Sequence, residues 1–502
     1  MSENQSTMSN DSAGIADLRS VADGASLHYL GTVVVNVVGF LLNLLLTRLL
    51  GASVYGIYAY GTMILNAVLL FATVGTDVSI TKYLSANRDD PAYQRRMLGL
   101  AYLTTIVGSL VTAAIVYIAA PTITAHTLEE SMLTTALRIF AIALPFQALG
   151  KIASSTVRGL EKPTEKTVIM VVAPTIRLVA IAAAVALGYS LLGIAAAFAV
   201  AAVMAALFGV GYSLSRTDLR PSGRFSRSET TEFYNFSAPL TLSKASSFLF
   251  KRVDVFMVGF LLASADVGIY NIAVLLAGVI AMPLAGFNQF FPPVASRLYS
   301  NEEYDTLESI YATVTRWSIT ASVAIALPLY VYRTEVLTLF GPEFVAGTLV
   351  VTLFIAGQLF NAAAGPANDL LTMTDHQYLV MGNHFVFGVC NVVLNYYFIL
   401  EFGLIGAALA TATVLATLNV VRVLEVWYLE GLFAYSLALW KPCVATAVSA
   451  AVMYGLRLYL GGTVVVFVGG AAGTAAFLGT LYLLGLDEQD IQIADEYLGL
   501  VS

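Results

Sequence analysis

The chain has 502 residues, of which 58% are hydrophobic and only 11% charged, and its mean hydropathy is +0.80. Soluble globular domains carry about 25% charged residues, so the composition excludes that class and predicts an all-α integral membrane protein. The four histidines are scattered, and Cys390 and Cys443 lie in or beside apolar runs, so we expect no metal site. We expect no cofactor and no nucleic-acid partner.

A helix needs about 20 apolar residues to cross the hydrocarbon core of a bilayer. Stretches of this kind predict about fourteen transmembrane helices in chain order. Their expected ranges are 26–49, 54–75, 97–119, 132–154, 167–187, 190–212, 235–262, 266–291, 311–332, 345–371, 378–400, 403–427, 438–459 and 463–485.

Two groups of residues recur at a nearly constant offset along the chain. Ala52-Ser53 followed by Gly56-Ile57-Tyr58 returns as Ala263-Ser264 followed by Gly268-Ile269-Tyr270, and the motifs around Gly193 and Gly406 are spaced in the same way. This pattern indicates a duplication, in which helices 1–6 and helices 7–12 form two repeats and the last two helices are appended. Such pseudo-symmetric halves are typical of transporters.

The repeats divide the chain into expected domains. These are a polar cytoplasmic segment at 1–25, an N-terminal transmembrane lobe at 26–212, a cytoplasmic linker at 213–234, a C-terminal transmembrane lobe at 235–427, two additional helices at 428–485 and an acidic cytoplasmic tail at 486–502. Most of the basic loop residues fall on the side of the N-terminus, while Arg48, Arg333 and Arg457 fall on the other. The positive-inside rule therefore places both termini of this multi-pass protein in the cytoplasm and the chain in the cell membrane.

The helix expected at 235–262 carries four charges, Lys244, Lys251, Arg252 and Asp254. A charge near the bilayer centre is costly and usually faces a cavity, so these residues indicate a cationic wall of a binding site. At about 100° per residue, Lys244 and Lys251 lie on one side of the helix, with Asp254 about one turn further along. The alternative is a Lys251–Asp254 pair that only fixes helix packing.

Other charges lie in neighbouring spans. Arg177 is in the middle of the span 167–187, which holds no acid to pair with it, whereas Arg138 and Lys151 lie toward opposite ends of the span 132–154. Asp77 and Asp369 lie near cytoplasmic helix ends, where they would act in charge pairing or ion coupling. Because the interior bases outnumber the interior acids, the cavity is expected to attract an anion such as a phosphate or diphosphate.

Four motifs give the chain a resemblance to a known family. It resembles the polysaccharide-type flippases, often called Wzx, of the multidrug/oligosaccharidyl-lipid/polysaccharide exporter superfamily. The resemblance implies a fourteen-helix transporter with a cationic interior, which alternates between inward-open and outward-open forms and turns lipid-linked sugars to the outer leaflet. The motifs are Gly51-Ala52 before Tyr55-Gly56-Ile57-Tyr58, Asp254 before Val258-Gly259 and Val267-Gly268-Ile269-Tyr270, Leu339-Phe340-Gly341-Pro342-Glu343-Phe344, and Asn395-Tyr396-Tyr397 with Phe402-Gly403-Leu404-Ile405-Gly406-Ala407-Ala408.

These observations predict a flippase, and no enzyme, for a polyprenyl-(di)phosphate-linked oligosaccharide used in surface polysaccharide or glycoprotein synthesis. Membrane lipids and glycan polymerase or glycosyltransferase machinery are the expected partners, and an H+ or Na+ gradient is the expected driving force. The alternatives are a drug exporter of the same superfamily, a membrane enzyme acting on lipid-linked sugars, and a passive scramblase or scaffold. The expected substrate-binding residues are Lys251, Arg252, Arg177, Arg138, Lys151 and Lys244, and the expected ion-coupling or charge-pairing residues are Asp254, Asp77 and Asp369.

Overall fold

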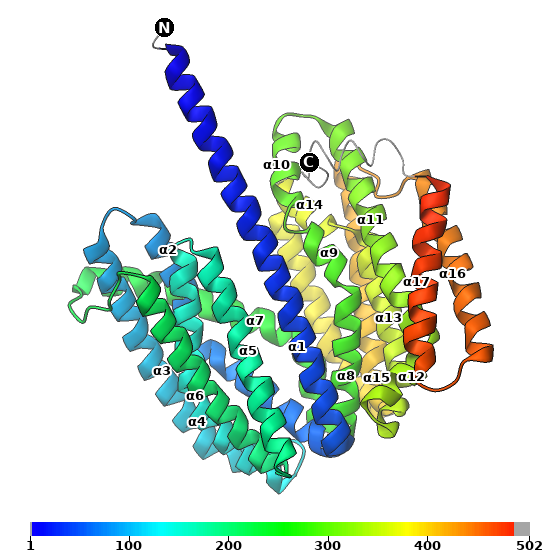
Figure 1. Ribbon diagram of the computed structural model, residues 1–502, viewed down its shortest axis with the longest axis horizontal. Helices are drawn as coiled ribbons and strands as arrows, with labels where there is room; N and C mark the ends of the chain where they lie inside the picture. Colours follow the sequence, from blue (N-terminus) through cyan, green and yellow to red (C-terminus); the bar gives the residue numbers. More distant parts are fainter. Residues whose placement is uncertain (1–2, 486–502) are drawn as a thin grey trace. The chain divides into compact units, whose positions relative to one another are not determined.

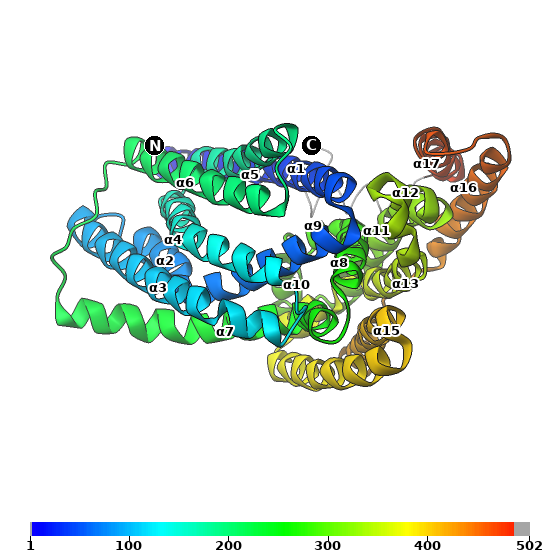
Figure 2. The same ribbon diagram turned by 90° about the horizontal axis from the view of Figure 1, so that it is seen from below.

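The computed structural model describes residues 3–485, with side chains described for 30–248 and 252–485. Within this part every regular element is a helix (Figures 1 and 2), which confirms the predicted all-α class. The acidic tail predicted at 486–502 and the side chains of the polar segment at 1–25 lie outside the described residues.

The chain divides into two compact units. The first unit holds the chain up to Leu50 together with Ile57–Arg252, and the second holds Gly51–Gly56 together with the chain from Val253 onward. The helices that belong mainly to the first unit are α1 (Glu3–Thr73), α2 (Thr76–Ala86), α3 (Pro91–Ala125), α4 (Ser131–Gly159), α5 (Pro163–Ala186), α6 (Leu191–Arg216) and α7 (Arg227–Leu261), which ends in the second unit.

The second unit contains the remaining helices. They are α8 (Ser264–Ile280), α9 (Met282–Phe287), α10 (Phe291–Ser300), α11 (Tyr304–Val331), α12 (Arg333–Phe340), the short 3-10 helix η1 (Pro342–Gly347), α13 (Thr348–Ala364), α14 (Ala367–Met373), α15 (Gln377–Glu430), η2 (Leu437–Leu439), α16 (Trp440–Tyr459) and α17 (Val464–Leu484). The fourteen predicted spans fall mainly on helical chain, although turns at 281, 288–290 and 365–366 interrupt two of them. Ten of the described helices are long and apolar enough to cross a membrane. The count of fourteen spans stays a prediction.

Two of these ten helices bend at a glycine where the sequence predicts a boundary between spans. Gly51 breaks α1 with φ 70°, and Gly403 breaks α15 with φ 57°. Both values lie in the left-handed region, which glycine adopts without the steric cost that a Cβ would bring. At the first bend, the backbone N–H of Ala52 donates to a carboxylate oxygen of Glu343 at 2.6 Å, so an acid from η1 caps the new helix start.

The membrane environment explains how polar side chains are accommodated in the spans. With no water in the hydrocarbon core, each hydroxyl needs a partner inside the protein. Several threonines donate to the carbonyl four residues earlier, a bond that keeps the hydroxyl within its own helix. Examples are Thr112 to Gly108, Thr156 to Ile152, Thr167 to Pro163 and Thr352 to Thr348.

The duplicated glycine motifs contact each other inside the second unit. A Cβ added to Gly56 would lie 1.8 Å from the carbonyl oxygen of Ser264, and a Cβ added to Gly268 would lie 2.3 Å from the carbonyl oxygen of Ala52. The hydroxyls of Ser53 and Ser264 are 2.7 Å apart. Each copy therefore presents to the other the same contact that it receives, as a local two-fold axis requires.

In the first unit, α4 packs along both α3 and α6, and α5 lies beside α6 (Figure 2). Between α6 and α7 the chain is non-helical only over 217–226, inside the linker predicted at 213–234. This segment is fixed to α3, because Leu219 is buried and the N–H of Ser222 donates to the carbonyl of Arg95 at 2.9 Å. It therefore holds the start of α7 against α3.

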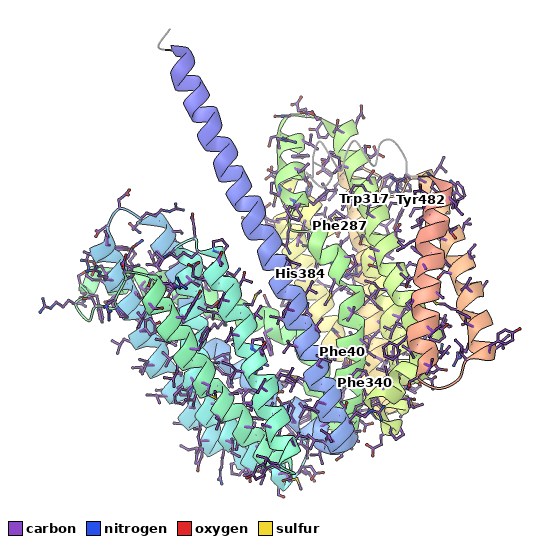
Figure 3. All side chains as sticks on the ribbon, viewed as in Figure 1. Phe40, Phe287, Trp317, Phe340, His384 and Tyr482 are labelled. Atoms are coloured by element: carbon purple, nitrogen blue, oxygen red, sulfur yellow. The ribbon has the colours of Figure 1, made fainter. Side chains whose placement is uncertain are left out.

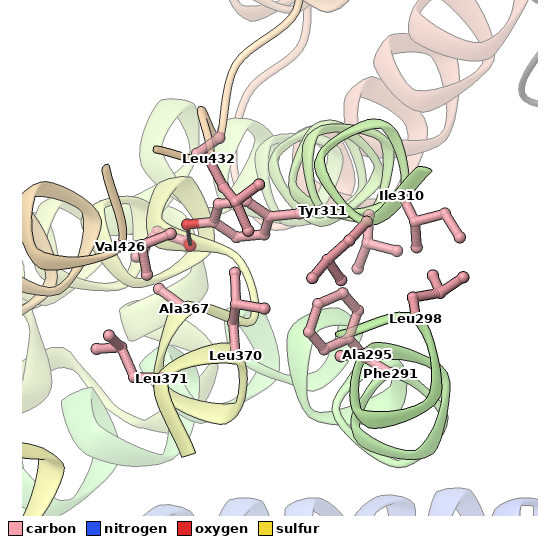
Figure 4. Close-up of a cluster of buried hydrophobic side chains, with 14 of the residues drawn as sticks. Phe291, Ala295, Leu298, Ile310, Tyr311, Ala367, Leu370, Leu371, Val426 and Leu432 are labelled. Atoms are coloured by element: carbon pink, nitrogen blue, oxygen red, sulfur yellow. Dashed lines mark hydrogen bonds between the residues drawn. The ribbon is translucent and has the colours of Figure 1, made fainter. Parts of the chain in front are cut away.

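The second unit has its main described core where α10, α11, α14 and the end of α15 meet. Phe287 and Trp317 lie at its edge with ring centroids 6.0 Å apart (Figure 3). In the centre, Tyr311 is fully buried and donates its hydroxyl to the carbonyl of Ala364 at 3.3 Å (Figure 4). That bond satisfies the carbonyl of the last residue of α13, where the chain turns into α14.

The appended pair α16 and α17 packs together and against α11. The hydroxyl of Tyr332 donates to the carbonyl of Met453 at 2.8 Å, and Arg457 donates to the carbonyl of Val331 at 2.9 Å and to Glu335 at 2.7 Å. These bonds attach the two additional helices firmly to the second unit.

Candidate functional site

Three of the charged residues predicted from the sequence meet in the first unit. The Nζ atoms of Lys244 and Lys151 lie 2.7 Å and 3.4 Å from the same carboxylate oxygen of Asp77. Lys151 comes from α4, Lys244 from α7 and Asp77 from α2. The three residues form what we call the Asp77 cluster, which links helices that are distant in sequence.

The local backbone explains why Asp77 is available at this place. The helix after α1 restarts at Gly75, which has φ 68°, and Asp77 lies in the first turn of α2. A carboxylate near a helix N-terminus is stabilised by the free N–H groups there. A Cβ on Gly75 would lie 2.3 Å from the carbonyl oxygen of Ser237, so this glycine also lets α7 approach α2 closely enough for Lys244 to reach.

The Asp77 cluster carries more positive than negative charge. Asp77 is 6% exposed, whereas the side chains of Lys151 and Lys244 are 32% and 30% exposed. Arg158 adds another cation, because it donates to the backbone carbonyl of Asp77 at 3.4 Å and to the hydroxyl of Thr81 at 3.0 Å. One carboxylate therefore faces two ammonium groups on partly exposed side chains.

Replacing Asp77 by asparagine tests this arrangement. Removing one partner of a buried pair costs about 3–5 kcal/mol, and the partial exposure of both lysines brings the expected loss to the lower end of that range. We expect a clearly lower unfolding temperature for Asp77→Asn in detergent. The double variant Asp77→Asn/Lys151→Gln should regain part of the loss, because it removes one of the two uncompensated cations.

The matched control for this prediction is Asp369→Asn. Asp369 lies in the first turn of α14, and its carboxylate accepts a hydrogen bond from the side-chain amide of the adjacent Asn368 at 3.3 Å. An unfolding temperature that falls equally in both single variants would show that Asp77 has no special role in pairing.

Arg177 forms a second cationic feature of the first unit. Its guanidinium lies 4.7 Å from the ring centroid of Phe198, which packs edge-to-face against Phe140 and Tyr58. Cation–π contact of this kind holds the planar group without using its N–H donors. Among the residues whose side chains the structure describes, none forms a hydrogen bond or ion pair with Arg177.

The other predicted cations are arranged differently. Arg138 is exposed, and its guanidinium lies 5.2 Å from the ring centroid of Tyr117. Arg252 is partly buried on α7, at the point where the division between the two units falls. The side chain of Lys251 lies outside the described residues, so its predicted role stays a prediction.

Asp254 belongs to the second unit and is 6% exposed. Its carboxylate accepts from the hydroxyl of Tyr270 at 2.8 Å, from the N–H of Val255 at 2.8 Å and from the hydroxyl of Thr411 at 3.4 Å. These contacts connect α7 with α8 and α15. The sequence singled out Tyr270 only as part of the repeated motif, and no local pattern pointed to Thr411.

At the cytoplasmic side predicted for the first unit, Glu229 fixes the start of α7. It accepts from the N–H of Ser226 at 2.7 Å and from Arg96 at 2.8 Å. Burial alone would raise the pKa of Glu229, but these hydrogen bonds outweigh it and lower that pKa below its ordinary value. The carboxylate therefore stays charged at neutral pH and holds the helix that carries Lys244.

Within the described residues, no group of three or more His, Cys, Asp or Glu side chains is spaced to hold a metal ion. The Asp77 cluster and Arg177 supply lysine and arginine donors in the first unit. Such donors bind oxyanions, and the arginine fork fits two phosphate oxygens at once.

Comparisons with known proteins give the family and the fold. A family model described as "Polysaccharide biosynthesis protein" matches residues 21–299, and a model for MatE matches residues 239–397. Two relatives come from Haloferax volcanii, the "Probable low-salt glycan biosynthesis flippase Agl15" and the "Probable flippase AglR". The first is 26% identical over 261 residues, which cover 50% of this chain and 53% of the relative. The second is 26% identical over 240 residues, which cover 45% of this chain and 48% of the relative. The chain thus spans about half the length of these curated relatives.

Two solved structures share the fold. The lipid II flippase MurJ, in an inward closed conformation, aligns with a TM-score of 0.69 at 14% identity, covering 91% of this chain and 98% of MurJ. An inward-facing MATE transporter of the MOP superfamily aligns with a TM-score of 0.63 at 15% identity, covering 78% and 93%. The matches confirm the resemblance stated from the motifs. Because the first family model matches more than half of this chain, the chain belongs to the polysaccharide biosynthesis protein family.

Proposed function

We propose that the chain is an alternating-access flippase, which moves a polyprenyl-(di)phosphate-linked oligosaccharide from the cytoplasmic to the outer leaflet. The product would feed surface polysaccharide or glycoprotein synthesis. The names of the two Haloferax relatives, one of them a glycan biosynthesis flippase, support this proposal. So does the family of polysaccharide biosynthesis proteins to which the chain belongs.

The observation that carries the proposal is the guanidinium of Arg177 in an apolar span, which has no hydrogen-bond or ion-pair partner among the described side chains. Placing a permanent charge there is costly unless it serves a ligand, and every N–H donor of Arg177 is left available by its stacking on Phe198. A phosphate or diphosphate supplies several acceptor oxygens and at least one negative charge. It would therefore complete the hydrogen bonding of this residue.

The Asp77 cluster supports the same class of substrate. Two ammonium groups share one carboxylate, so the Asp77 cluster keeps a net positive charge. This charge would attract an incoming phosphate while the contacts to Asp77 stay in place. A transporter that exports cations would instead need a site with more acidic than basic side chains. The head group would thus bind among the lysines and arginines of the first unit, while the polyprenyl tail stays in the bilayer.

The remaining parts of the proposal concern topology, partners and energy. Both termini would be cytoplasmic, because the basic loop residues gather on that side. Glycosyltransferases would supply the lipid-linked sugar, and a polymerase or transferase at the outer face would consume it. An H+ or Na+ gradient would drive the cycle, with Asp254 linking α7 to α8 and α15 while the units move.

The test uses a strain that lacks the protein, rescued by wild type or by variants. Lipid-linked oligosaccharides are extracted after treatment of intact cells with a membrane-impermeant label, which reports on which leaflet they occupy. We expect cytoplasmic-facing material to accumulate in the deletion strain, in Arg177→Ala and in Lys151→Ala/Lys244→Ala. Wild type should restore labelling.

Two controls remove a positive charge outside the proposed site. Arg220 is exposed in the linker, and Lys162 is partly buried just before α5, where it donates to the carbonyl of Arg216. Arg220→Ala and Lys162→Ala should both rescue. Rescue by the site variants would leave the flippase proposal standing and remove the site, whereas normal sidedness in the deletion strain would favour an exporter or an enzyme.

A further inference from the structure

A histidine and a buried arginine face each other in the second unit, outside the groups discussed so far. Helix α15 consists of two arms on either side of Gly403, and His384 lies on the first arm, where Figure 3 labels it. Arg422 lies on the second arm and is 8% exposed. Nη2 of Arg422 and Nε2 of His384 are 2.7 Å apart.

The chemistry of the two groups determines their protonation states. A guanidinium has only donors and remains charged, so Nε2 of His384 must be the acceptor and carry no proton. The imidazole in this contact is therefore neutral, with its proton on Nδ1. A second proton on His384 would turn the acceptor into a donor and bring two cations within hydrogen-bond distance, and the contact could not persist.

Arg422 has other groups to which it could turn. Its Nη1 donates to the amide oxygen of Asn419 at 3.3 Å, while its buried Nε has no hydrogen-bond partner among the described residues. Two carboxylates interact with it electrostatically, Glu425 on the same arm and Asp369 on α14. If the contact with His384 is lost, the guanidinium of Arg422 therefore has two carboxylates nearby as alternative partners.

The other elements that contact α15 add few charges, and one of these is Asp254 of α7, which accepts from Thr411 of α15 at 3.4 Å. Helix α13 contains no titratable residue, and α14 contributes only Asp369. On α15 itself, Glu425 accepts from the amide of Asn383 at 2.7 Å, and His376 lies 3.3 Å from Glu430 at the end of the helix. Arg422 lies in hydrogen-bond contact with His384 from the second arm.

We infer that His384 is a proton-binding site that couples transport to a proton gradient by making or breaking the contact between the two arms of α15. With neutral His384, Arg422 links the arms. With protonated His384, Arg422 turns to Glu425 or Asp369 and this contact between the arms is lost, while the Asn383–Glu425 and His376–Glu430 contacts still join them. The ligand is a proton and not a sodium ion, because Nε2 is an imidazole nitrogen bound to a cation, whereas hard cations take oxygen ligands.

A histidine is suited to this role because its unperturbed pKa, about 6.5, lies between pH 5 and 8. Each state has its own hydrogen-bonded partner for Arg422, so the element has two discrete arrangements. The inference rests on the proposed function, because it supplies the coupling ion for that flippase.

The experiment uses the full chain in liposomes with a fluorescent, short-chain polyprenyl diphosphate oligosaccharide. Flipping is measured with and without an imposed pH gradient, and over external pH 5.5 to 8. We expect the gradient to accelerate wild type and to have no effect on His384→Gln, whose amide oxygen keeps an acceptor for Arg422 but takes no proton. Arg422→Gln should also lose the gradient response, since His384 then has no cation to repel.

The matched control is His376→Gln, which removes the other histidine of α15 and should keep the response. His384→Asn, which also provides an amide oxygen, replaces His384→Gln if that variant is recovered poorly. A gradient response in the His384 variants, or its absence in wild type that flips, would overturn the inference and leave the flippase proposal intact. Wild type that does not flip at all would remove the proposed function and the inference with it.

Discussion

Gly56→Ala is expected to abolish transport and to reduce sharply the amount of folded protein. The added Cβ would lie 1.8 Å from the carbonyl oxygen of Ser264, and the obstacle is backbone, which cannot move away as a side-chain end can. Overpacking a core typically costs about 1–3 kcal/mol, and a backbone clash of this kind lies at or above the upper end. Gly268→Ala should act in the same way, because its Cβ would lie 2.3 Å from the carbonyl oxygen of Ala52.

The measurement is the yield of monodisperse protein after detergent extraction, together with the leaflet-labelling assay. Gly278→Ala is the control. Gly278 lies on α8, as Gly268 does, but a Cβ added there would have no atom within 4 Å. Normal yield and transport in Gly56→Ala would show that the contact between the two motifs opens freely, contrary to the packing described.

Arg177→Ala is expected to lower the flipping rate at limiting substrate by roughly 10- to 150-fold. A hydrogen bond to a charged group is worth about 1.5–3 kcal/mol, and the arginine fork makes such bonds to the phosphate if the proposed site is right. Arg177→Lys should recover only part of the rate, because an ammonium keeps the charge but lacks the fork.

The rate is measured in liposomes over a series of substrate concentrations, with Arg220→Ala as the variant that removes an arginine from the linker. The unfolding temperature of Arg177→Ala should change little, since among described side chains Arg177 forms no ion pair that would be broken. If Arg177→Ala flips at the wild-type rate, the phosphate binds elsewhere.

Much of the architecture was predictable because the membrane imposes it. Long apolar stretches must be helical in lipid, and the breaks lie at predicted boundaries, Gly51 between two predicted spans and Gly403 at the first residue of the next one. The predicted family is confirmed because the family model matches residues 21–299.

The site was predictable only as a set of separate charges. The sequence indicates Asp77 as an ion-coupling or pairing residue and Lys151 and Lys244 as substrate ligands, but the three belong to one cluster. Nothing local reveals this, because the contact depends on how α2, α4 and α7 pack. His384 was overlooked for a similar reason, since its partner Arg422 lies on the other arm of α15.

The reciprocal contact of Gly56 and Gly268 has an evolutionary consequence. In an ancestral half that worked as a homodimer, one mutation at this glycine would have placed two Cβ atoms in the interface at once. In one continuous chain each copy can change alone, and the caps differ, with Ala52 bound by distant Glu343 and Ala263 by nearby Asp266. The two glycines are less free to change, because a Cβ added at either one would meet backbone of the other motif.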